Sequence, residues 1–137
     1  MNTYIDATGP KRWMLVDDNE EILMMISSLA MNLTNATMEC HNSPESALAA
    51  YTADPDAYEV VITDYEMPRM TGIELCRLIQ SVAPQQRVIL ATGSGYFTPG
   101  AARAAGFSAL LHKPFPFSAL VTALVEAGFE VENPLTA

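Results

Sequence analysis

The chain has 137 residues, of which 50% are hydrophobic and 17% are charged, a composition typical of one globular domain rather than a disordered segment. Its formal net charge is −9 at pH 7 and it contains no run of Lys or Arg, which argues against nucleic acids and anionic membranes as partners because both bind basic surfaces. No apolar run reaches the ~20 residues that a membrane-spanning helix needs, and the amino terminus lacks the apolar core of a signal peptide, so we expect a cytoplasmic protein.

Apolar segments predict five strands. Compact runs of large apolar side chains within residues 13–16, 59–63 and 87–91 are typical of strands buried on both faces, which show a continuous apolar run instead of alternation. Two further short segments, at residues 36–41 and 109–111, complete the set. The strands are therefore expected to form the centre of the domain.

The segments between these strands predict helices, because their apolar side chains recur at the spacing of one helical face. The first helix follows Asp18 or Asn19, either of which could cap it, and its apolar spacing continues to Leu33. The second opens with Ser43-Pro44-Glu45, the cap, proline and acid typical of a helix start, and it stops near residue 54.

Three more helices are expected in the second half of the chain. One follows the loop at residues 67–72 and runs to about residue 82, and its apolar face is formed by Leu75, Leu78, Ile79 and Val82. Glycines and a proline follow the fourth strand, so the next helix, at about residues 101–105, must be short. The last has apolar residues at helical spacing from 117 to 125, and Gly128 is suited to its carboxyl end.

Short apolar strands that alternate with amphipathic helices predict an α/β domain whose parallel sheet is covered on both faces. Five of each fit the flavodoxin-like (βα)5 fold, with strand order 2-1-3-4-5 and right-handed crossovers. We assign residues 1–11 to an extension, 12–128 to the domain and 129–137 to a short tail. Cys40 and Cys76 lack metal-ligand spacing, and we interpret them as buried free thiols.

Polar side chains follow four of the strands where each strand ends. Asp17 and Asp18 follow the first strand, Asp64 the third, Thr92 the fourth and Lys113 the fifth. Because the carboxyl ends of parallel strands meet at one edge of the sheet, we expect these side chains to converge. Two carboxylates ~4 Å apart repel by about 4 kcal/mol at an effective dielectric of 20, and a Mg²⁺ ion bound by oxygen ligands would remove that cost.

This set of side chains fits phosphoryl transfer. Asp64 beside a bound cation could act as a nucleophile toward a phosphoryl donor, while Lys113 and Thr92 interact with the phosphoryl oxygens. Structural alternatives exist for each residue taken alone: Asp17 and Asp18 as helix caps, Asp64 in a turn, and Lys113 as a solvated lysine.

Four motifs occur in order: Leu15-Val16-Asp17-Asp18-Asn19, Asp64-Tyr65-Glu66-Met67-Pro68 with Thr71-Gly72, Leu90-Ala91-Thr92-Gly93, and His112-Lys113-Pro114-Phe115. Through these motifs, residues 12–127 resemble the receiver domain of response regulators, the phosphoacceptor module of two-component signalling. The resemblance implies that Asp64 accepts a phosphoryl group from a phosphohistidine on a sensor histidine kinase or a histidine phosphotransfer protein. It further implies specific site roles: Mg²⁺ ligands at Asp17, Asp18, Asp64 and the main-chain carbonyl of Glu66, a switch hydroxyl at Thr92, a phosphate partner at Lys113, and a cis Lys113–Pro114 bond.

The chain departs from the family pattern near its fourth and fifth strands. Three residues before Lys113 the family usually has Tyr or Phe as a rotating switch residue, whereas this chain has Leu110. A glycine-rich stretch follows Thr92, and either Tyr96 or Phe97 within it could stand in for the missing ring.

Three functions remain open. We expect a stand-alone receiver that signals through altered protein contacts, because only ten residues follow Ala127; one such contact would be a homodimer through the face of the last two helices and the fifth strand. The alternative is a receiver-like scaffold that phosphorylation does not switch, which Leu110 favours. A Mg²⁺-dependent phosphohydrolase with Glu66 as acid/base lacks a segment for a substrate pocket, so we expect no enzyme activity beyond self-phosphorylation and autodephosphorylation.

Overall fold

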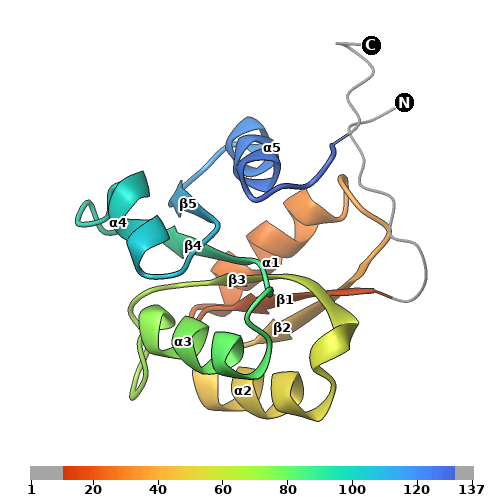
Figure 1. The fold of residues 1–137 in the computed structure, drawn as a ribbon. Helices are drawn as coiled ribbons and strands as arrows, with labels where there is room; N and C mark the ends of the chain where they lie inside the picture. The colour runs from red at the N-terminus through yellow and green to blue at the C-terminus, as the bar shows by residue number, and fades with distance from the viewer. Residues whose placement is uncertain (1–10, 132–137) are drawn as a thin grey trace.

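The computed structural model describes residues 11–131, which form a five-stranded parallel sheet with helices on both faces (Figure 1). The sheet has the predicted strand order, β2-β1-β3-β4-β5. The strands are β1 (Arg12–Val16), β2 (Thr37–His41), β3 (Tyr58–Thr63), β4 (Val88–Thr92) and β5 (Ala109–His112). The predicted extension, except residue 11, and most of the predicted tail lie outside the described residues.

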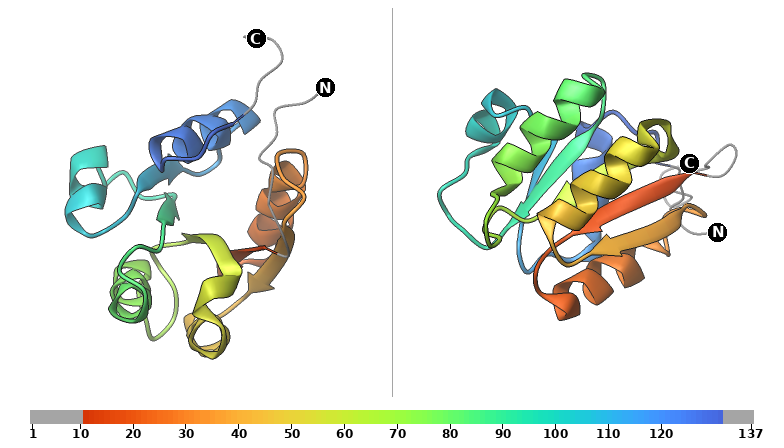
Figure 2. Two further views of the ribbon diagram at one scale, coloured as in Figure 1. Left: turned by 45° about the vertical axis from the view of Figure 1, so that its right-hand side comes forward. Right: turned by 90° about the horizontal axis from the view of Figure 1, so that it is seen from below.

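Each strand is followed by a helix, and the five helices are α1 (Glu20–Ala30), α2 (Pro44–Ala53), α3 (Gly72–Val82), α4 (Pro99–Ala104) and α5 (Phe117–Glu126). A single 3₁₀ turn, η1 (Pro55–Ala57), precedes β3. Helices α1 and α5 cover one face of the sheet, and α2 and α3 cover the other (Figures 1 and 2). Helix α4 lies beside β5. Within the described residues, none of the helices has the length and apolar character that a bilayer crossing requires.

The central strands are apolar on both sides because each side faces a separate core. In β1, Trp13 and Leu15 pack in the core beneath α1 and α5, while Met14 and Val16 pack in the core beneath α2 and α3. This alternation follows from the two-residue period of a strand. The continuous apolar runs in the sequence therefore correspond to strands buried on both faces, as predicted.

The helix starts follow their predicted local chemistry. Asn19 caps α1, and its side-chain oxygen accepts hydrogen bonds from the N–H groups of Glu21 and Ile22. Ser43 caps α2 and is followed by the predicted proline. Gly128 has a φ of 96° just past α5, a left-handed conformation that glycine adopts without strain.

Three sequence-based predictions of helix faces and burial are wrong. Helix α1 ends at Ala30, although Leu33 is fully buried, because the chain turns after the helix and returns Leu33 to the same core. On α3, Cys76 shares the buried face with Leu75 and Ile79, so Leu78 and Val82 are 40% and 45% exposed. Cys40 is exposed because β2 is an edge strand, which has a neighbouring strand on one side only.

The end of the domain packs on the sheet beyond the last helix. The ring of Phe129 lies 6.4 Å from that of Trp13, measured between centroids, and the Arg87 guanidinium lies 4.5 Å above the Phe129 ring. Phe129 is 8% exposed and belongs to the core beneath α1 and α5. This residue therefore closes one end of that core.

Candidate functional site

The carboxyl ends of four strands bring the predicted site residues to one edge of the sheet. Main-chain hydrogen bonds continue just past the strands: the Asp64 N–H donates to the Val16 carbonyl over 2.9 Å, and the Lys113 N–H to the Thr92 carbonyl over 2.8 Å. The Asp17 N–H likewise donates to the edge strand, at the carbonyl of His41, over 3.1 Å. The side chains that follow are thus fixed in position by the sheet itself.

Three carboxylates and one ammonium group meet at this edge. Each of Asp17, Asp18 and Asp64 offers a carboxylate oxygen, and these oxygens all lie within 4.8 Å of one another. Lys113 Nζ lies 2.8 Å from Asp17 Oδ2 and 3.1 Å from Asp64 Oδ1. Two main-chain N–H groups orient the carboxylates further, that of Asn19 on Asp17 Oδ1 and that of Tyr65 on Asp64 Oδ1.

The electrostatics of the cluster favour an additional cation. Burial raises the pKa of Asp64, and repulsion by Asp17 raises it further, while the nearby ammonium of Lys113 opposes both effects. Burial would lower the pKa of Lys113, but hydrogen bonding and attraction to Asp17 and Asp64 outweigh it and raise that pKa. Three carboxylates against one ammonium leave an excess of negative charge, and the all-oxygen donor set is the kind that Mg²⁺ binds.

An open cavity of about 560 Å³ gives access to the cluster. It is lined by Asp18, Asp64, Glu66, Thr92, Gly93, Ser94 and Lys113. Asp17 is 2% exposed and lies behind this lining, paired with Lys113. The structure therefore brings all six predicted site residues together, five at the cavity wall and Asp17 beneath it.

Thr92 is held by the loop that follows it. Its Oγ1 accepts a hydrogen bond from the Ser94 N–H over 3.0 Å, and the side chain is almost fully buried. The hydroxyl hydrogen of a residue that already accepts one bond can still be donated. Thr92 can therefore act as a donor to a ligand in the cavity.

Helix α3 begins in direct contact with the backbone of Asp64. At Gly72, a Cβ atom would overlap the carbonyl oxygen of Asp64 and would lie 3.2 Å from the Cα atom of Tyr65. Thr71 caps the helix by accepting a hydrogen bond from the N–H of Glu74. The Thr71-Gly72 pair therefore places the helix start against the backbone of Asp64.

Sequence reasoning missed one aromatic contact beside the site. The rings of Tyr65 and Phe97 meet edge to face, with centroids 4.9 Å apart. Phe97 is one of the two candidates for a substitute ring, and its partner cannot be predicted from the sequence because both residues lie in irregular loops. Leu110 is half-buried and packs against the same core as these rings. The Lys113–Pro114 bond is cis, as the family resemblance implied.

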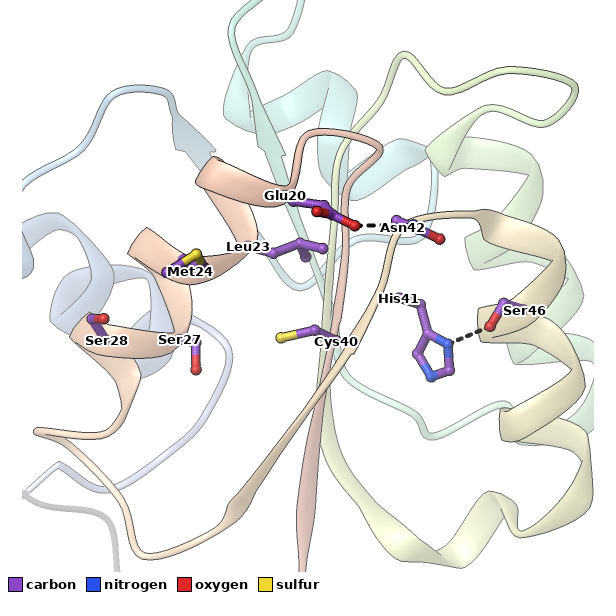
Figure 3. A pocket seen from close by; sticks show the side chains of 9 residues that line it. All are labelled: Glu20, Leu23, Met24, Ser27, Ser28, Cys40, His41, Asn42 and Ser46. Carbon is purple, nitrogen blue, oxygen red and sulfur yellow. Dashed lines mark hydrogen bonds between the residues drawn. The ribbon is translucent and has the colours of Figure 1, made fainter.

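A second cavity, of about 540 Å³, lies between α1 and the edge strand β2 (Figure 3). Cys40 and Met24 contribute to its wall. Its polar side chains pair with one another: His41 Nδ1 lies 2.7 Å from Ser46 Oγ, a contact drawn in Figure 3. The converging carboxylates lie elsewhere, at the carboxyl edge of the sheet, so the candidate chemistry is placed there.

Comparisons with known proteins agree with this geometry. The transcriptional regulatory protein CutR of Streptomyces coelicolor is 28% identical over 122 residues, which cover 88% of this chain and 55% of CutR. The chain thus spans about half the length of that relative. A response regulator receiver domain protein from Clostridium thermocellum has a TM-score of 0.76 and 28% identity, over 85% of this chain and 93% of that one. A BeF3-activated DrrB receiver domain has a TM-score of 0.70 and 26% identity, over 86% and 97% of the two chains.

The family assignment follows from the sequence, the fold and the site taken together. The four motifs supply the residues, the parallel sheet brings them to one edge, and solved receiver domains have the same fold. The model of one protein family, the response regulator receiver domain, matches residues 14–125. The chain therefore belongs to the response regulator receiver domains of two-component signalling.

Proposed function

We propose that Asp64 accepts a phosphoryl group from a phosphohistidine, on a sensor histidine kinase or a histidine phosphotransfer protein. The observation that carries the proposal is the position of Lys113 Nζ, 2.8 Å from Asp17 and 3.1 Å from Asp64. This ammonium joins Asp17 to the phosphoacceptor in the wall of a polar cavity. No comparable arrangement of carboxylates occurs elsewhere in residues 11–131.

The reaction forms one bond and breaks one. An ionised oxygen of Asp64 attacks the phosphorus, a P–O bond forms, and the P–N bond of the phosphohistidine breaks. The electron pair of that bond stays with the imidazole nitrogen, which takes up a proton. The Tyr65 N–H holds the Asp64 carboxylate in orientation, while Lys113 and the Thr92 hydroxyl would bind phosphoryl oxygens.

The acid cluster would hold Mg²⁺. Asp18 is exposed at the cavity wall and is suited to direct coordination, whereas both oxygens of Asp17 are already engaged by Lys113 and the Asn19 N–H. Asp64 and the main-chain carbonyl of Glu66 complete the protein ligands in this proposal. When bound, the ion supplies positive charge that offsets the charge of the phosphoryl oxygens.

Output would occur through changed protein contacts at the surface formed by α4, β5 and α5. Thr92 ends β4 and precedes α4, and Lys113 directly follows β5, so both phosphate-binding side chains connect to this surface. A homodimer through this surface is one form that the output could take. In this proposal the chain turns over no external substrate and catalyses only its own phosphorylation and dephosphorylation.

The experiment is to incubate the protein with Mg²⁺ and phosphoramidate, whose P–N bond resembles that of phosphohistidine, and to measure intact mass. We expect one added phosphoryl group in the wild type and in Asp56→Asn, which changes an acid in η1, the turn that precedes β3. Asp64→Asn should show no addition. Phosphoryl uptake by Asp64→Asn at the wild-type rate would refute the assignment.

A receiver-like scaffold is the second candidate, and Leu110 favours it because an aliphatic side chain replaces the usual ring. The two functions are distinguished by measuring the solution mass and the partner binding with and without Mg²⁺ and beryllofluoride. A change on adding beryllofluoride supports the phosphorylation switch. Identical behaviour, with beryllofluoride bound, supports the scaffold.

A further inference from the structure

Two loops beside the site are joined by a ring contact. Tyr65 directly follows Asp64, and its N–H donates to Asp64 Oδ1 over 2.8 Å. The Tyr65 ring meets the ring of Phe97, which lies in the loop between β4 and α4. Both rings are half-buried against the core beneath α2 and α3. A displacement of Tyr65 therefore acts directly on the loop that leads into α4.

The loop from Thr92 to α4 has few other attachments. Ser94 bonds to Thr92 through its N–H, and its Oγ accepts the Tyr96 N–H over 3.2 Å. A Cβ atom added at Gly93 or Gly95 would meet no described atom within 4 Å, so no neighbouring group packs against these two positions of the loop. The loop is thus held at Thr92, which lines the same cavity as Asp64, and at Phe97, which contacts the residue that follows Asp64.

Thr98 transmits the position of the loop to α4. It directly follows Phe97 and caps α4 by accepting the Ala101 N–H at its Oγ1 over 3.1 Å. A shift of Phe97 therefore displaces Thr98, the residue that caps the helix. Leu110, by contrast, is an aliphatic side chain on β5 and offers no ring at the position where the family usually has one.

Phosphorylation of Asp64 would change what Tyr65 is bonded to. The Asp64 carboxylate is a charged acceptor for the Tyr65 N–H, whereas an acyl phosphate presents a carbonyl oxygen with much less charge. Hydrogen bonds to charged groups are about twice as strong as neutral ones, so the restraint on Tyr65 weakens when the phosphoryl group is added. The two states of the site therefore restrain Tyr65 to different extents.

We propose that the Tyr65–Phe97 contact couples the chemical state of Asp64 to α4, and that it replaces the ring that Leu110 lacks. The coupling rests on the proposed function, because it requires Asp64 to be the phosphoacceptor. Linkage requires the coupling to be reciprocal: loss of the ring contact must also change the affinity of the site for a phosphoryl mimic.

The test is amide hydrogen exchange over residues 93–105, with and without Mg²⁺ and beryllofluoride as the phosphoryl mimic. The variant Phe97→Leu keeps an apolar side chain and removes the ring. Tyr96→Leu is the matched control, because that ring is in the same loop and is 90% exposed. We expect beryllofluoride to change exchange rates by about fivefold or more in the wild type and the control, and this change to be lost in Phe97→Leu.

Tyr65→Leu should lose the response as Phe97→Leu does, because the contact requires both rings. The affinity for beryllofluoride, from the shift in melting temperature, is measured for each variant and shows that the variants are folded and loaded. An undiminished exchange response in loaded Phe97→Leu overturns the coupling and leaves the proposed function intact. A wild-type protein that takes up no beryllofluoride overturns the proposed function itself, and the coupling with it.

Discussion

Replacing Gly72 with Ala tests whether α3 must begin in contact with the phosphoacceptor. The added Cβ would overlap the Asp64 carbonyl oxygen, which is backbone and cannot move aside as a flexible side chain would. Overpacking of this kind costs about 1–3 kcal/mol, and the better helix propensity of Ala returns roughly 0.5–1 kcal/mol. We expect a net loss of about 1–2 kcal/mol, which for a domain of this size lowers the melting temperature by roughly 3–10 °C.

The assay combines thermal unfolding, followed by circular dichroism, with the phosphoramidate reaction. Gly95→Ala is the matched control, because a Cβ there meets no described atom within 4 Å and its melting temperature should stay within ~2 °C of wild type. Phosphoryl uptake by Gly72→Ala should slow by about tenfold or more, since small displacements of reacting groups are costly. If Gly72→Ala melted and reacted like Gly95→Ala, the close approach would not be needed to position Asp64.

Three further predictions concern charge and burial. Lys113→Met should tighten Mg²⁺ binding in calorimetry, because it removes a cation that competes for Asp17 and Asp64. Phosphoryl uptake should become slower in the same variant, and an unchanged Mg²⁺ affinity would contradict the pairing. Burial raises the pKa of Asp64, so the protonated carboxyl favours the folded state at low pH, and this contribution to stability is lost as the pH rises and the group ionises. Mg²⁺ binds the ionised carboxylate, so the increase in melting temperature that Mg²⁺ causes should be larger at pH 7 than at pH 4; an equal increase at both pH values would contradict this. Tyr51→Phe removes a hydroxyl that donates to Gln86 Oε1 over 2.6 Å, and it should cost about 1 kcal/mol of unfolding free energy with phosphoryl uptake unchanged.

The sheet and the site edge could be predicted because each depends on a regular pattern. Strand bounds agree with the sequence to within a residue or so, since buried parallel strands are marked by unbroken apolar runs. The convergence of Asp17, Asp64 and Lys113 then follows from topology alone, as parallel strands place their carboxyl ends together. No further sequence pattern is needed to predict that these three side chains lie together.

Other features depend on contacts that carry no period. On α3, the spacing of apolar residues fits two overlapping stripes, and only packing selects the one that contains Cys76 over the one that contains Leu78. The burial of Leu33 after the end of α1 is set by a turn, which looks like continued helix in the sequence. The Tyr65–Phe97 pair joins two irregular loops, and the chain offers no local pattern that relates them.

The location of the single tryptophan separates two kinds of measurement. Trp13 lies fully buried at the start of β1, with its indole N–H on Glu59 and its ring near Phe129, whereas Asp17 and the acid cluster lie past the other end of the same strand. Its emission should therefore report loss of the core and remain silent to ions or phosphate at the far edge. Melting curves followed by this emission can therefore be recorded in the presence of ions or phosphate without a ligand signal added to the unfolding signal.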